Sequence, residues 1–123
     1  WWNGTNWSVG QGAGIGTASV TNDTTKFHMY GMVFDGSQTG NANRLKFRYD
    51  RSLKTMSYTG TVGTTTATPA YMFFGGDARN SGTFSKLYMN GYIGEVLIWT
   101  RTLTDSEISS VELYINTKWA LGL

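Results

Sequence analysis

The chain has 123 residues and contains no cysteine. Structural disulfides and thiolate metal sites are therefore excluded. Charged residues are also scarce, at 15% of the chain, and the formal net charge is only +2. A charge this small gives no electrostatic case for a nucleic acid or a membrane surface as partner. No apolar run approaches the roughly 20 residues that cross a bilayer, so we expect no membrane span.

Proline is represented by Pro69 alone, whereas glycine occurs 16 times and aromatic residues make up 15% of the chain. Together with abundant Thr and Ser, this composition favours short strands and tight turns over a helical bundle. The length predicts a single domain over residues 1–123. We predict strands at residues 8–10, 15–21, 26–34, 44–50, 55–59, 71–75, 86–89 and 92–99.

The strand predicted at 44–50 alternates between two kinds of side chain. Its apolar face carries Leu45, Phe47 and Tyr49, which we expect to point inward. Its other face is basic and is extended by two later residues. The five cations are Arg44, Lys46, Arg48, Arg51 and Lys54. They indicate either a surface for an anionic partner or a solvated sheet face that discourages edge pairing.

The end of the chain predicts a helix. Thr104 is a candidate N-cap, and Glu107 three residues later completes a capping box. Asp105 adds negative charge in the first turn, where the helix dipole favours it. Gly122 is placed as a C-terminal stop. One buried face is indicated by Ile108, Val111, Ile115 and Trp119.

Three stretches resemble the laminin-G-like branch of the concanavalin A-like lectin/glucanase superfamily. They are KFHMYGMVFDGS (26–37), YMFFGGDARNSG (71–82) and NGYIGEVLIWTRTLTDSEI (90–108). The resemblance implies an all-β fold, an antiparallel jelly-roll sandwich with one C-terminal α-helix. Domains of this family run longer, and their strands before the central one are mostly absent here. We therefore expect another chain or a missing segment to complete the sandwich.

Lectin-like sandwiches place ligand and calcium sites in rim loops, and the resemblance directs attention to two such loops. The first contains Asp35, and the second contains Asp77, Arg79 and Asn80. Arg79 has the fork geometry for sugar hydroxyls or a carboxylate. Calcium prefers hard oxygen ligands, so Asp35 and Asp77 are the predicted metal ligands. The alternative is ordinary turn chemistry, because Asp and Asn tolerate unusual backbone angles.

The opening WWNGTNW carries three tryptophans, Trp1, Trp2 and Trp7. Indole rings stack on the apolar faces of sugars, so Trp2 and Trp7 are candidate ligand-binding residues. The alternative is that they form core or an interface, where aromatic side chains are enriched.

Catalysis is not expected. Retaining glucanases of this superfamily use paired carboxylates in an E-x-D-x-x-E run, one as nucleophile and one as acid. This chain has no such run, and Glu95 stands without a neighbouring carboxylate. The lone His28 fits a satisfied core or face residue. We therefore predict that the protein is not an enzyme.

The preferred function is a non-catalytic carbohydrate-binding or adhesion module that recognises a glycan or cell-surface receptor. The alternative is a structural virion or cell-surface assembly protein, a decoration or fibre module completed by a partner chain. Either function places the protein outside the cell, at a cell surface or at a virion surface.

Overall fold

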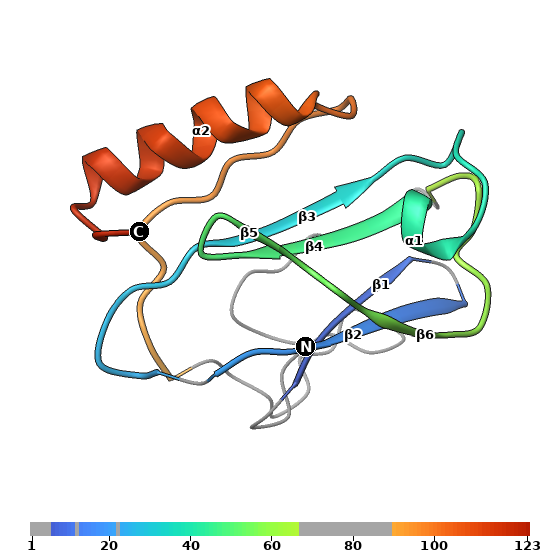
Figure 1. Cartoon of the computed structure of the whole chain (residues 1–123), viewed down its shortest axis with the longest axis horizontal. Helices are drawn as coiled ribbons and strands as arrows, with labels where there is room; N and C mark the ends of the chain where they lie inside the picture. The colour runs from blue at the N-terminus through green and yellow to red at the C-terminus, as the bar shows by residue number, and fades with distance from the viewer. Residues whose placement is uncertain (1–5, 12, 22, 67–89) are drawn as a thin grey trace. The chain divides into compact units, whose positions relative to one another are not determined.

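The computed structural model describes residues 6–11, 13–21, 23–66 and 90–123. The chain divides into two units, one of residues 1–66 with 101–123 and one of residues 67–100. The first unit contains all the helices and strands of the described residues (Figure 1).

The first unit has two antiparallel three-stranded sheets. One sheet has the order β1-β2-β6, built from β1 (Asn6–Gln11), β2 (Gly14–Ser19) and β6 (Ser57–Thr59). The other has the order β3-β4-β5, built from β3 (Tyr30–Phe34), β4 (Leu45–Tyr49) and β5 (Ser52–Lys54). The helices are a single turn, α1 (Asn41–Arg44), and the long C-terminal α2 (Asp105–Lys118). The predicted mostly-β class with a C-terminal helix is thus confirmed.

The core joins the two sheets. Ala18 and Val20, at β2 and just after it, form one buried cluster with Phe47 and Tyr49 of β4. Val9 and Met56 pack against this cluster. The alternation predicted for β4 is confirmed, because its odd-numbered residues are buried and its basic residues are not.

Several strand boundaries differ from the prediction, and long-range bonds explain why. Residues 26–29 are not part of β3. The Met29 carbonyl accepts from the Asp50 amide, but the Met29 amide donates to the Asp50 side chain and not to a backbone carbonyl. Only residues 57–59 of the strand predicted at 55–59 form a strand, β6, and β5 lies just before the predicted range, at residues 52–54. β5 pairs with β4 and β6 pairs with β2, so the chain crosses between the sheets at Thr55 and Met56.

The strand predicted at 92–99 is wrong, because residues 91–99 have no regular secondary structure. The segment is apolar on both faces, a pattern that gives a strand only when partners cover it. Its predicted hairpin partner at 86–89 lies outside the described residues, as does the strand predicted at 71–75.

Helix α2 begins as predicted. Thr104 accepts from the Glu107 backbone, and the Glu107 side chain accepts from the Thr104 backbone, which completes the capping box. The end of the helix differs, because Ala120 rather than Gly122 follows the cap in the left-handed region, with φ 49°. Its amide and that of Leu121 donate to Thr117 and Asn116, the two bonds of a Schellman motif.

Candidate functional site

The loop after β3 is shaped by its first residue, Asp35. Its Oδ1 accepts from the backbone N and the hydroxyl of Ser37, at 3.0 and 2.6 Å, and its Oδ2 accepts from Gln38 Nε2 at 3.0 Å. These bonds, led by the Ser37 hydroxyl, lower the pKa of Asp35. At Gly36 a Cβ would collide with the Thr64 carbonyl, so the Asp-Gly pair is required by close packing of two loops.

Helix α1 ties this loop to the chain that follows β6. Asn41 donates to the Gly60 carbonyl at 2.9 Å and accepts from the Val62 amide at 3.0 Å. Arg44 donates to the carbonyls of Gln38 and Val62, at 2.7 and 2.9 Å. The Val62 side chain is fully buried, so these side-chain to backbone bonds lie around a buried residue.

The turn between β1 and β2 joins the same end of the unit. Gln11 donates through Nε2 to the Thr65 carbonyl. In Figure 1 this turn, α1 and the segment after β6 gather at one end of the sheets. We name this cluster the polar rim; it consists of Gln11, Asp35, Gln38, Asn41, Asn43 and Arg44. These bonds fix the directions of the side chains, and each amide, carboxylate or guanidinium group has more hydrogens or lone pairs than they use.

Calcium does not fit the polar rim as the structure describes it. The ion takes six to eight oxygen ligands, usually with several carboxylates. The rim supplies one carboxylate, Asp35, and both of its oxygens already accept hydrogen bonds. Within the described residues no group of three or more His, Cys, Asp or Glu side chains could hold a metal ion. Asp77, the second predicted ligand, lies outside them.

Most of the other predicted ligand-binding residues also lie outside the described part of the chain. Trp2, Arg79 and Asn80, like Asp77, lie outside the described residues. Trp7 is half-buried, with its ring centroid 4.3 Å from that of Tyr30 and 6.4 Å from that of Phe47. Its surroundings favour the core alternative that the sequence left open.

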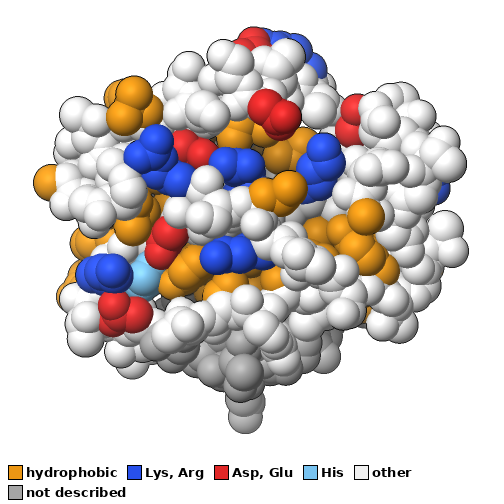
Figure 2. Space-filling view, in the orientation of Figure 1, with side chains coloured by type: hydrophobic (Ala, Val, Ile, Leu, Met, Phe, Trp, Pro, Cys, Tyr) orange, Lys and Arg blue, Asp and Glu red, His pale blue; other side chains and the backbone are white. Residues whose placement is uncertain are grey.

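The basic residues around β4 are largely engaged inside the unit. Arg48 forms a two-pronged ion pair with Glu112 of α2, at 2.6 and 2.9 Å, and this bond raises the pKa of Arg48. Arg51 donates to the Leu123 carbonyl at 2.8 Å, and Lys54 lies 5.6 Å from the centre of the Tyr49 ring. Figure 2 shows basic and acidic side chains close together over one face. These contacts favour a structural role over a docking surface for an anion.

His28 lies in a buried network of hydrogen bonds. The sequence showed only an isolated histidine and did not predict the network. The side chain is 6% exposed, with Nδ1 2.7 Å from Asp50 Oδ2 and Nε2 3.0 Å from the Asp23 carbonyl. Tyr49 places its hydroxyl 2.9 Å from Nδ1, and burial raises the pKa of Tyr49 to about 12. Since both ring nitrogens are satisfied by local partners, His28 is structural, as the sequence suggested.

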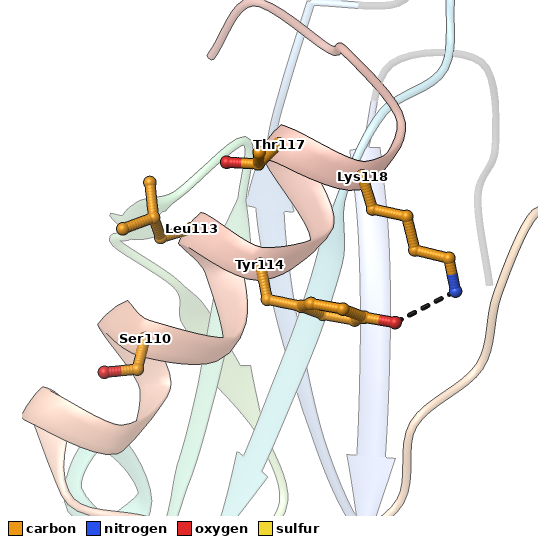
Figure 3. Close-up of a pocket in the computed structure, with 5 residues that line it drawn as sticks. All are labelled: Ser110, Leu113, Tyr114, Thr117 and Lys118. Atoms are coloured by element: carbon orange, nitrogen blue, oxygen red, sulfur yellow. Dashed lines mark hydrogen bonds between the residues drawn. The ribbon is translucent and has the colours of Figure 1, made fainter.

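The outward face of α2 carries a shallow pocket (Figure 3). Its described lining comes from this one helix: Ser110, Leu113, Tyr114, Thr117 and Lys118. Lys118 Nζ donates to the Tyr114 hydroxyl at 2.9 Å. A site formed by a single helix face fixes few directions in a ligand, so the polar rim remains the better candidate.

Comparison with protein-family models, with curated proteins and with solved structures finds no match to this chain. The laminin-G-like resemblance therefore stays a prediction. No helix among the described residues is both long and apolar enough to cross a membrane.

Proposed function

We propose that this protein is a non-catalytic carbohydrate-binding module that recognises surface glycans through its polar rim. One observation carries the proposal: the rim side chains are braced by bonds to the backbone of two separate segments, the loop after β3 and the chain after β6. Binding to a preorganised polar surface costs less ordering entropy than binding to a mobile one. Sugar hydroxyls need such directional partners.

The proposal includes the finer structural and cellular predictions. The two sheets are part of a laminin-G-like jelly roll, and the protein acts outside the cell, at a cell surface or at a virion surface. Catalysis is not part of this function. Calcium binding by Asp35 or Asp77 stays a prediction.

A glycan array followed by titration calorimetry tests the proposal. Asp35→Asn keeps the acceptor oxygen for Ser37 and removes the charge. We expect it to weaken binding about tenfold, the size of one hydrogen bond to a charged group. Leu53→Ala, an exposed apolar change on β5, serves as the control and should bind as the parent does. Titration with calcium, in the parent and in Asp77→Ala, tests the metal.

The absence of glycan binding by the folded parent chain would overturn the proposal. Equal binding by the parent and by Asp35→Asn would remove the polar rim as its site. Neither result depends on the metal, because calcium can be supplied or chelated in parallel titrations.

A second candidate, an assembly module completed by a partner chain, is favoured by exposed apolar side chains. Tyr92 is 87% exposed, and five further apolar residues of its segment are also open: Ile93, Val96, Leu97, Ile98 and Trp99. Apolar groups gathered in this way mark interaction surfaces. Sedimentation of the chain alone would separate the candidates, since a stable oligomer without glycan binding favours assembly and a glycan-binding monomer favours recognition.

A further inference from the structure

Two aromatic rings from distant parts of the first unit meet at its surface. Phe27 precedes β3, and Trp119 follows α2. Their ring centroids are 6.4 Å apart, and the ring planes are tilted by 36°. Phe27 is 47% exposed and Trp119 is 41% exposed, although the sequence placed Trp119 on the buried face of the helix. The pair therefore forms an apolar surface open to solvent, which we name the aromatic platform.

The backbone under each ring is held by contacts of its own. Phe27 is followed by His28, which is fixed by Asp50 and by the Asp23 carbonyl. Trp119 donates its amide to Ile115 at 3.0 Å and lies inside the Schellman motif of α2. Rings presented on fixed backbone lose little freedom on binding, so stacking on them is favoured.

Hydrogen-bonding groups lie beside both rings in the chain. Close to the phenyl ring in the sequence, Asp23 accepts from the Thr25 backbone and hydroxyl, and it lies 3.9 Å from Lys26 Nζ. Next to Trp119, Lys118 places its Nζ over the indole ring, 5.6 Å from the ring centre. An apolar surface with polar groups beside it matches a ligand that has an apolar face and a hydroxylated edge.

The size of the platform decides what can occupy it. A fully buried aromatic side chain contributes about 150–250 Å². Two rings that are each less than half exposed therefore offer on the order of 200 Å², far below the roughly 800 Å² per partner of a stable protein interface. A single pyranose ring, with its face of C–H groups and its rim of hydroxyls, is of the right size and chemistry.

We propose that Phe27 and Trp119 form a stacking subsite for a pyranose ring of a neutral oligosaccharide. This subsite rests on the proposed carbohydrate recognition and lies at the other end of β3 from the polar rim. The rim follows Phe34, whereas the platform precedes Tyr30, and five strand residues span roughly 16 Å. A linear glycan would thus contact the protein at two separated places.

Titration with linear hexasaccharides of glucose, mannose, galactose and xylose tests the subsite. We expect Trp119→Ala and Phe27→Ala each to weaken the best binder about tenfold, and Trp119→Phe to retain most of the affinity. Leu53→Ala, an exposed apolar change on β5, is the control and should leave affinity unchanged. Near-ultraviolet circular dichroism and thermal melting of each variant identify any that fail to fold, for which Trp119→Leu replaces Trp119→Ala.

The outcomes separate the subsite from the proposed function. If the parent binds and Asp35→Asn weakens binding while the folded platform variants bind as the parent does, the subsite is overturned and the function stands. If no hexasaccharide binds the parent, the subsite is overturned, and the glycan array decides the function. If the platform variants lose affinity and Leu53→Ala does not, the subsite is supported.

Discussion

Strand β4 and the segment at 92–99 are both rich in apolar residues, yet only β4 forms a strand. β4 has β3 on one edge and β5 on the other, and its basic face is met by Glu112 of α2. The segment at 92–99 pairs with no strand in the described part of the chain. A single apolar face with two partners therefore specifies a strand, whereas two apolar faces leave the structure dependent on what covers them. Removing the supports of β4 one at a time tests this difference.

The largest effect is expected from Phe47→Ala in the centre of β4. The ring is 2% exposed and belongs to the core that joins the two sheets. Its truncation leaves a cavity, and the free energy of unfolding should fall by about 4 kcal/mol. Ile98→Ala, in the unpaired segment, should change it by no more than about 0.5 kcal/mol. Urea denaturation of both variants gives the two values, and equal losses would show that the segment belongs to the same core.

The ion pair between Arg48 and Glu112 is the next support, because it attaches α2 to the outer face of the sheet. Glu112 is buried, so removing its charge leaves Arg48 without its partner. Glu112→Gln should therefore lower the free energy of unfolding by about 3 kcal/mol. The double variant Arg48→Met with Glu112→Leu should recover most of this loss, since it removes both charges and fills the space. If the double variant melts no higher than Glu112→Gln, the pair stabilises the protein by orienting α2, and the cost of an unpaired buried charge is not the main effect.

The turn between β4 and β5 is the third support. Asp50 and Arg51 both have positive φ, 47° and 62°, a region that aspartate tolerates but that is uncommon for arginine. Asp50 is held there by His28 and by the amide of Met29. Asp50→Asn keeps the shape and loses the charge, so we expect a loss of about 2 kcal/mol, within the range for a hydrogen bond to a charged group.

Chemical denaturation measures that loss, and the matched control is Asp35→Asn in the exposed turn after β3. The control should change stability far less, because its carboxylate lies in solvent. A similar loss for both would indicate that turn conformation, rather than the buried network, sets the cost.

The sequence predicted the supports that depend on local patterns better than the supports that join distant segments. The alternation of β4 and the capping box at Thr104 depend on residues within one element, so the sequence was sufficient for both. The pairing of Arg48 with Glu112 joins elements far apart in the sequence, and no local pattern carries it. The passage of the chain between sheets at Met56 was missed for the same reason.

The candidate site follows the same rule. Asp35 with Gly36 is ordinary turn chemistry, and the loop was predicted from it. The brace supplied by Asn41 was not predicted, because it depends on where the chain after β6 lies. Trp119 was placed on the buried stripe by its spacing, but it follows the last residue of α2 and is 41% exposed. The other members of the stripe are half-buried: Ile108, Val111 and Ile115.

The C-terminal end of α2 offers a smaller, stabilising change. Ala120 occupies the left-handed position of the Schellman motif, where a side chain costs roughly 1–2 kcal/mol. Ala120→Gly removes this cost but adds backbone freedom to the unfolded chain. We therefore expect a net gain of up to about 1 kcal/mol, seen as a higher melting temperature. Gly122→Ala, also at positive φ but outside the motif, is the control and should lower the melting temperature.

The smallest effect concerns the opposite end of α2, where Glu107 closes the capping box. Its hydrogen bonds lower the pKa of Glu107 from 4.5 to about 2, and the bond from Arg101 contributes more than either bond from Thr104. Because the folded pKa lies below the unfolded one, this stabilisation is present above pH 4.5 and is lost as the pH falls toward 2. The pair is exposed to solvent, so added salt should weaken the effect. Melting temperatures of the parent and of Glu107→Gln should therefore converge between these pH values, and a constant difference would show that the cap acts without its charge.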